Sequence, residues 1–394
     1  MELARNPCPP AASIAQANDA RSLGPFTFLE FFAGGGMARA GLGPKWRCLF
    51  ANDVDSRKCS AYESNWGAGS ILAGDVARLA PSDIPGPASL AWASFPCQDL
   101  SLAGTGAGLD GARSGTFWPF WTLIRALHAD AKGPRIVVLE NVVGALSSHG
   151  GRDFAAIAGA LAKEGRRFGA LVIDARRFLP QSRPRLFVIA VSPGMQIPTS
   201  LIGEPASAPR ALRAAFDGLD RRTKSLWTWW RLPEPPRRNL SLSDIVDDER
   251  GNVCWHSKAE TARLVSLMSK AHRAKLARAR QSGDRVVGAV YRRTRVDGSG
   301  RKVQRAEIRF DGVAGCLRTA RGGSSRQTIL IVEGRDTRSR LLSPREAARL
   351  MGLPEDYKLP ARCNEAYDLI GDGVAVPVVR HIAETILEPL LNSQ

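Results

Sequence analysis

A cysteine that follows a buried strand is the first residue of this 394-residue chain whose type and position suit chemistry. The mostly apolar run 90–95 predicts a strand that stops at Pro96, because proline has no N–H to donate to a sheet. Cys97 comes next, and a glycine-rich stretch, 103–108, follows it. A thiol at a strand end beside a pliable loop suits a nucleophile. A buried structural cysteine is the alternative, and it would be favoured if Cys97 stood alone.

Acidic and basic side chains accompany two further predicted strands. Glu140 directly follows the apolar run 136–139, at a carboxyl end, where parallel sheets collect ligands. A carboxyl beside a thiol can hold or give a proton on a substrate, although carboxylates also favour helix starts. Arg183 and Arg185 precede the strand predicted over 186–190, and alternate residues of an extended chain project the same way. This pair suits a carbonyl oxygen or a phosphate.

The elements that must position these groups begin with a strand over 26–32, a glycine turn at 34–36 and a helix from Met37. This order is typical of the first unit of a nucleotide-binding α/β fold. Glycines let the backbone approach a ligand closely, although tight turns without ligands are common. The pattern by itself is therefore weak.

The next two predicted strands end in acids. Asp53 lies about 20 residues past the glycines, where such folds place an acid on the ribose hydroxyls. A helix-capping aspartate is the alternative, and Asp55 suits that role. Asp75 ends the third strand, where it could accept a hydrogen bond from an adenine amino group. The chain has no GxxxxGK[ST] phosphate cradle, so the pattern favours S-adenosylmethionine over ATP.

Charge points to a polyanionic partner. The chain has 55 Lys and Arg against 38 Asp and Glu, a net charge of +17. Such an excess most often indicates nucleic acid, with an acidic membrane surface as the competing partner. No long apolar segment or signal peptide is evident. Seven cysteines without a CxxC pair argue against zinc sites and disulfides, and they fit a reducing cytoplasm.

Much of the charge lies in one stretch. Residues 261–310 hold 14 Lys or Arg and 3 Asp or Glu, which is +11 of the total. The run 271–280 predicts a basic helix that carries Lys275 and Arg278, and the runs 291–295 and 301–305 predict a hairpin. A solvated face is the usual explanation of a charge run, but this concentration favours contacts to phosphates.

Taken in order, these motifs closely resemble the bacterial DNA (cytosine-5) methyltransferases. The resemblance covers about residues 26–194 and 312–390. Two positions depart from the family pattern: Asp372 stands where Asn is common, and Ser94 where Gly is common. The matching segments are Phe32-Ala33-Gly34-Gly35-Gly36, Asn52-Asp53, Gly74-Asp75, Phe95-Pro96-Cys97-Gln98, Glu140-Asn141-Val142, Gln181-Ser182-Arg183-Pro184-Arg185, Leu342 to Gly352, and Gly371-Asp372-Gly373-Val374.

The resemblance implies a Rossmann-like, S-adenosylmethionine-dependent methyltransferase domain with a smaller target-recognition domain. It implies that a flipped cytosine is attacked at C6 by Cys97, with Glu140 at N3 and with Arg183 and Arg185 on the base. No metal is needed. The cofactor-binding residues implied are Phe32, Gly34, Gly36, Asp53, Val54, Asp75, Val76, Pro96, Phe117 and Asp372. The residues predicted to bind DNA are Gln98, Ser101, Lys275, Arg278 and Arg318.

The predicted organisation is a tail over 1–24, a catalytic core over 25–194, a target-recognition domain over 195–330, and a return to the core over 331–394. We expect a bacterial, cytoplasmic, nucleoid-associated protein that acts as a monomer on double-stranded DNA, with a separate restriction endonuclease as a possible partner. An RNA cytosine-5 methyltransferase and a catalytically idle DNA-binding protein remain the alternatives. The sequence does not reveal the target site.

Overall fold

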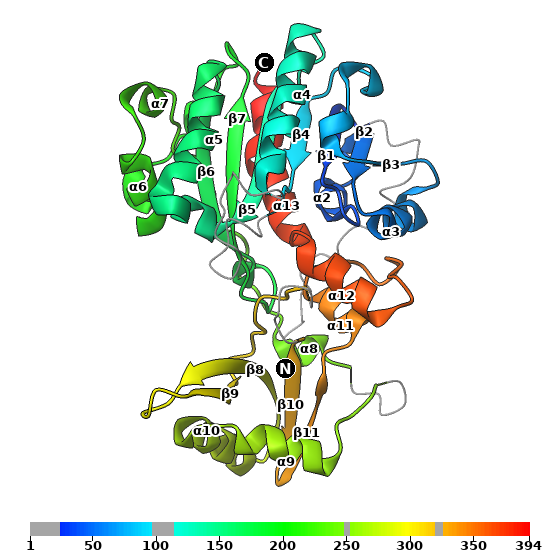
Figure 1. Ribbon diagram of the computed structural model, residues 1–394, viewed down its shortest axis with the longest axis vertical. Helices are drawn as coiled ribbons and strands as arrows, with labels where there is room; N and C mark the ends of the chain where they lie inside the picture. Colours follow the sequence, from blue (N-terminus) through cyan, green and yellow to red (C-terminus); the bar gives the residue numbers. More distant parts are fainter. Residues whose placement is uncertain (1–23, 97–113, 248–252, 320–325) are drawn as a thin grey trace, which may run out of the picture.

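A computed structural model describes residues 24–96, 114–247, 253–319 and 326–394. Two lobes lie one above the other in Figure 1. The large lobe is built around a seven-stranded sheet and the small lobe, within residues 253–341, around a four-stranded sheet. The predicted α/β fold with a second, smaller part is therefore confirmed.

The strands of the large sheet run in the order β3-β2-β1-β4-β5-β7-β6. Neighbours from β3 to β5 are parallel, whereas β7 is antiparallel to both β5 and β6. The start of β7 therefore lies at the same sheet edge as the end of β5. The strands are β1 (Phe26–Phe31), β2 (Trp46–Asp53), β3 (Leu72–Ala73), β4 (Leu90–Ala93), β5 (Ile136–Val142), β6 (Arg167–Asp174) and β7 (Pro184–Val191).

Helices cover both faces of this sheet. Successive strand residues point to opposite faces, and apolar side chains on both faces are buried under these helices. Phe28 and Trp92 face one apolar cluster, and Leu29 and Ala91 face the other. The large lobe contains α2 (Met37–Leu42), α3 (Ser56–Trp66), α4 (Phe117–Ala129), α5 (Arg152–Lys163), α6 (Arg210–Asp217), α7 (Arg221–Ser225), α11 (Pro344–Arg349), α12 (Cys363–Asp372), α13 (Val376–Ile382) and α14 (Glu388–Asn392).

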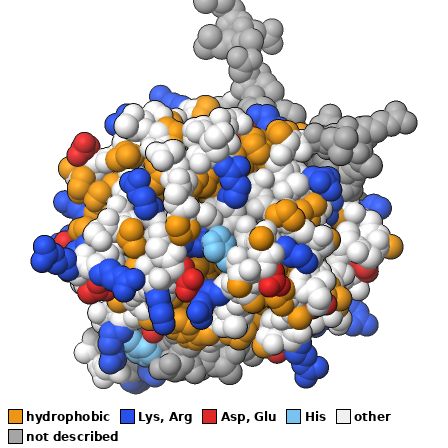
Figure 2. Space-filling view, turned by 90° about the horizontal axis from the view of Figure 1, so that it is seen from above, with side chains coloured by type: hydrophobic (Ala, Val, Ile, Leu, Met, Phe, Trp, Pro, Cys, Tyr) orange, Lys and Arg blue, Asp and Glu red, His pale blue; other side chains and the backbone are white. Residues whose placement is uncertain are grey.

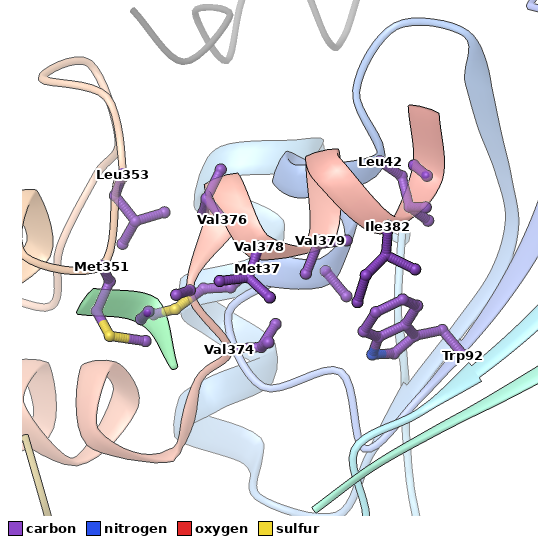
Figure 3. Packing of buried hydrophobic residues seen from close by; sticks show 14 of the residues in the cluster. Met37, Leu42, Trp92, Met351, Leu353, Val374, Val376, Val378, Val379 and Ile382 are labelled. Atoms are coloured by element: carbon purple, nitrogen blue, oxygen red, sulfur yellow. The ribbon is translucent and has the colours of Figure 1, made fainter. Parts of the chain in front are cut away.

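The C-terminal segment packs into the core of the large lobe. Helix α13 lies against α2, so that Val379 and Ile382 meet the core beside Met37 and Trp92 (Figure 3). A side chain at Gly41 of α2 would stand 2.4 Å from the Cβ of Val379. Glycine at this position therefore lets the two helices approach closely.

The small lobe has an antiparallel sheet in the order β11-β10-β8-β9, with two helices against it (Figure 1). The predicted basic helix is α10, and the predicted hairpin is β8 and β9. Leu264, Leu276 and Ile308 belong to its separate apolar cluster. The elements are α9 (Lys258–Ser266), α10 (Lys270–Gln281), β8 (Arg285–Val296), β9 (Lys302–Arg309), β10 (Thr328–Glu333) and β11 (Asp336–Leu341), and α8 (Leu242–Ile245) precedes them.

The lobe limits differ from the boundaries predicted at 195 and 330. The segment 195–230 stays with the large sheet, because Leu212 and Trp227 join its apolar cluster and Trp227 bridges to Phe168. The boundary at 330 falls inside β10, which forms a hairpin with β11, so the small sheet continues to Leu341. The boundary predicted at 195 therefore lies just after the end of β7, within the large lobe.

Candidate active site

The turn after β1 holds unusual backbone conformations. Phe32 has a φ of 55°, and Gly34 and Gly36 have φ of 57° and 77°. A positive φ strains a phenylalanine, and such strain is concentrated at functional sites. Asp53 at the end of β2 holds the turn, because its Oδ2 accepts a hydrogen bond of 2.8 Å from the N–H of Gly34.

The turn is closed on one side and open on the other. A side chain at Gly35 would stand 2.3 Å from the hydroxyl oxygen of Tyr357. The Gly35 carbonyl accepts hydrogen bonds from Tyr357 Oη at 2.8 Å and Trp66 Nε1 at 3.2 Å. No described atom lies within 4 Å of where a Gly34 side chain would begin. A ligand can therefore approach the backbone at Gly34.

The acids beside this turn occupy defined positions. Asp55 caps α3 by accepting from Arg57 N, so the capping role belongs to Asp55. Asp53 Oδ1 accepts from the Asp55 N–H at 2.9 Å, and each oxygen of Asp53 retains acceptor capacity for a ligand hydroxyl. Asn52 donates to the carbonyls of Leu72 and Gly74, which ties the short strand β3 to β2 and places Asp75 beside them.

The other predicted cofactor residues have different exposures. Val54 is 73% exposed, which is unusual for a large apolar side chain and suits a ligand contact. Val76 and Phe117 are buried, and Phe117 contacts the rings of Phe95 and Trp121. Phe117 therefore supports the site from within the core.

Asp372 has a partner that the sequence analysis missed. Its Oδ2 lies 2.6 Å from Nζ of Lys58, at the start of α3. Burial would lower the pKa of Lys58, but the carboxylates of Asp372 and Asp53 outweigh it and raise that pKa. The two residues are 314 positions apart, so the sequence contains no signal for this pair.

Glu140 and Arg185 form the second half of the site. Because β7 runs antiparallel to β5, Arg185 pairs with Val142 and lies beside Glu140. Arg185 Nε is 3.1 Å from Glu140 Oε1, and both side chains are largely buried. Burial raises the pKa of Glu140, and this rise is limited by the positive charges of Arg185 and Arg183 and by a hydrogen bond from Ser94. A carboxyl held in this way can exchange a proton with a ligand.

Arg183 lies in the same region but is held differently. It is 1% exposed, and its guanidinium donates to three backbone carbonyls, those of Leu317, Gly371 and Gly373, at 2.6–2.8 Å. The prediction placed Arg183 and Arg185 together on a substrate. The structure favours a bracing role for Arg183, which joins the start of β7 to the segment before β10 and to the C-terminal end of α12.

The predicted nucleophile, Cys97, lies outside the described residues, as do Gln98 and Ser101. The segment leading to Cys97 is held at the same sheet edge, because Asn141 Nδ2 donates to the Phe95 carbonyl at 3.2 Å. Ser94, noted in the sequence only as a departure from the family pattern, also contacts Glu140. Pro96 is the last described residue before the gap.

The predicted DNA-contacting residues of the small lobe are exposed. Lys275 and Arg278 lie on the solvent side of α10, whereas Leu276 and Ala279 face the small sheet. Arg318 is exposed before β10. Figure 2 shows the opposite end of the molecule, where Lys and Arg are scattered among hydrophobic and acidic side chains.

Two findings bear on metals and membranes. Within the described ranges, His, Cys, Asp and Glu side chains form no group of three or more that could hold a metal ion. None of the helices in the described part of the chain is both long enough and apolar enough to cross a membrane.

The parallel strands from β3 to β5, with the glycine turn after β1 and the acid at the end of β2, form a Rossmann-like fold. The model of one protein family, C-5 cytosine-specific DNA methylase, matches residues 26–388 of this chain. The chain therefore belongs to that family. Enzymes of this family transfer a methyl group from S-adenosylmethionine, and the resemblance stated from the motifs is confirmed.

Relatives of similar length support this assignment. The chain is 25% identical to the Type II methyltransferase M1.ScrFI of Lactococcus lactis subsp. cremoris, with 95% of this chain and 81% of the relative covered. It is 26% identical to M.HhaI of Haemophilus parahaemolyticus, with coverages of 91% and 93%. The methyltransferase EhMeth of Entamoeba histolytica has the same fold, with a TM-score of 0.62 at 12% identity and coverages of 93% and 98%.

Proposed function

We propose that this enzyme methylates C5 of a cytosine within a short specific sequence of duplex DNA, after flipping that cytosine out of the helix. The observation that carries the proposal is the buried Glu140–Arg185 pair at the sheet edge to which Asn141 ties the segment before Cys97. C5 lies inside the base stack, so the base must leave the duplex, at a cost of a few kcal/mol.

The residues suit an addition and elimination at the base. The Cys97 thiolate adds to C6, and Glu140 holds or protonates N3, so electron density collects at C5. C5 then attacks the methyl carbon, the bond from that carbon to the sulfonium sulfur breaks, and S-adenosylhomocysteine is the leaving group. A base removes the C5 proton, the C5–C6 double bond returns, and the thiolate leaves. Arg185, beside Glu140, is placed to bind the carbonyl oxygen of the base, while Arg183 braces the strand.

The residues around the glycine turn fit S-adenosylmethionine, which supplies an electrophilic methyl group. Gly34 leaves room for the ligand, and Asp53 retains acceptor capacity for the ribose hydroxyls. Val54 offers an exposed apolar surface for the adenine ring, and Asp75 an acceptor for its amino group. We place Phe32, Gly36, Val76 and Pro96 in the surrounding wall, Phe117 behind it and Asp372 at its edge.

We expect Asp53→Ala to weaken the binding of S-adenosylhomocysteine by about 5- to 150-fold, because the ribose hydroxyls and the Gly34 N–H both lose their acceptor. Calorimetric titration measures this affinity. Asp55→Ala is the matched control, since it removes a helix cap and leaves the acceptor in place. Unchanged affinity of a folded Asp53→Ala variant would contradict a ribose contact.

The small lobe is the proposed DNA-recognition lobe. We expect Lys275→Ala and Arg278→Ala to weaken binding to target and non-target duplexes equally, as for lost phosphate contacts. Each should also lower by about 1 the slope of log affinity against log salt concentration. DNA affinity across a salt series measures the slope. Arg213→Ala, at an exposed arginine of α6 in the large lobe, is the control. An unchanged slope in both small-lobe variants would mean that α10 presents a solvated face.

The function is tested by methyl incorporation from labelled S-adenosylmethionine into duplex DNA and into structured RNA. Label in DNA alone supports the proposal, and label in RNA alone supports the RNA alternative. No label in either, with S-adenosylhomocysteine still bound, supports an idle DNA-binding protein. Bisulfite sequencing of DNA from expressing bacterial cells would then identify the target sequence. We propose that the enzyme acts as a monomer on DNA in the cytoplasm, with any cognate endonuclease on a separate chain.

A further inference from the structure

A second cysteine lies beside the Glu140–Arg185 pair. Cys316 is in the segment between β9 and β10, far from Cys97 in sequence. Several hydrogen bonds attach this segment to the large lobe. Among them, the Ala314 N–H donates to the Pro180 carbonyl at 2.7 Å, and the Leu317 N–H donates to Gln181 Oε1 at 3.2 Å. These bonds bring Cys316 to the start of β7.

Both arginines of the site contact this sulfur. Arg183 Nη1 lies 3.4 Å from Cys316 Sγ, and Arg185 Nη1 lies 3.9 Å from it. Arg185 uses a different nitrogen, Nε, for Glu140. Arg185 Nη1 also donates to the carbonyl of Pro184 at 3.0 Å. The guanidinium is therefore contacted by the carboxyl through Nε, and by the sulfur and this carbonyl through Nη1.

We propose that Cys316 is a positioning residue for methyl transfer, and that its sulfur holds Arg185 in contact with Glu140. The proposal rests on the proposed function, because Glu140 and Arg185 take their roles from it. An arginine fixed at two points loses little conformational freedom when the base binds, so its orientation is set in advance.

The charges around the thiol strengthen the contact. Arg183, Arg185 and Arg318 all bring positive charge to Cys316, and the neutral Leu317 carbonyl lies 3.5 Å from its sulfur. Burial alone would raise the pKa of Cys316, but the three guanidinium groups outweigh it and lower that pKa. A hydrogen bond from a charged guanidinium is stronger than one from a neutral donor.

The first test measures the contact without any methyl transfer. We expect the pH dependence of iodoacetamide labelling at Cys316, followed by peptide mass spectrometry of the full chain, to move to higher pH in Arg185→Met. The exposed Cys363 in the same sample is the internal control, and its labelling should not change between the two proteins. Identical pH dependence of Cys316 labelling in both proteins would overturn the contact.

The second test measures the consequence for catalysis. We expect Cys316→Ala to lower kcat by about 5- to 30-fold with an unchanged KM for S-adenosylmethionine, and Cys316→Ser to restore most of the loss. In a second background, Arg185→Lys, the lysine ammonium cannot contact both Glu140 and Cys316. There, Cys316→Ala should lower kcat by less than about 2-fold. Cys363→Ala is the control.

The outcomes separate the two proposals. The same loss from Cys316→Ala in both backgrounds, or no loss at all, would overturn the positioning role. Absence of methyl transfer by the wild-type enzyme would instead overturn the proposed function, while iodoacetamide labelling would still report whether Cys316 contacts Arg185.

Discussion

Replacing Cys97 by alanine should reduce methyl transfer to the level without enzyme while the affinity for S-adenosylhomocysteine stays within about 2-fold, because the thiolate forms the covalent bond and the cofactor residues are separate. Activity with labelled S-adenosylmethionine and calorimetric titration measure the two quantities. Cys254→Ala, at an exposed cysteine of the small lobe, is the matched control and should keep full activity.

Duplex DNA with 5-fluorocytosine at the target position should trap the wild-type enzyme covalently. Fluorine at C5 leaves no proton to remove, so the thiolate cannot be expelled after transfer. The complex should survive denaturing electrophoresis, and peptide mapping should locate the adduct at Cys97. Appreciable turnover by Cys97→Ala, or an adduct at another cysteine such as Cys316, would contradict the assignment of the nucleophile.

Glu346→Ala should lower the free energy of unfolding by about 3–5 kcal/mol, since it leaves the buried Arg340 charge without its partner. Both side chains are fully buried, and Arg340 donates to the two oxygens of Glu346 at 2.5 and 2.7 Å. The same carboxylate accepts from the N–H groups of Ser343 and Asp247. It therefore joins β11, α11 and the segment after α8. Urea unfolding followed by tryptophan fluorescence measures the change.

Glu355→Ala is the matched control, because Glu355 is 64% exposed and pairs with Arg349; its loss should cost about 0–1 kcal/mol.

The stabilisation by Glu346 also depends on pH. Burial would raise its pKa, but hydrogen bonds from Arg340 and Ser343 outweigh it and lower that pKa. The stabilisation is therefore full above the unfolded value of 4.5 and disappears as the pH falls through the lower folded value. Equal unfolding midpoints for Glu346→Ala and Glu355→Ala would contradict this account.

Elements that depend on local pattern were predictable from the sequence. Apolar runs located β1, β4 and β5, and the glycines located the turn after β1. Asp53, Glu140 and Arg185 could be selected because each lies within or beside such an element, and parallel strands bring their carboxyl ends to one edge. The roles of these residues in cofactor binding and catalysis stay predictions.

Other features depended on contacts between distant segments. Residue spacing suggested one role for both arginines, but the carbonyls that hold Arg183 come from Leu317, Gly371 and Gly373, more than 130 residues away. The local sequence around Cys316 contains no signal for its contact with Arg185, which the fold alone creates. Contacts between distant segments also decide the Lys58–Asp372 pair and the lobe limit at Leu341.

The sequence by itself carried the motifs that identify the family. It also located the strands along the chain and the ends at which the polar residues lie, because side-chain periodicity and turn chemistry act over a few neighbouring residues. Only the tertiary structure decided which of those polar groups meet, because β7 reverses its direction beside β5 and so brings Arg185 to Glu140. Hydrogen bonds and ion pairs form over about 3 Å in space, whatever the separation along the chain.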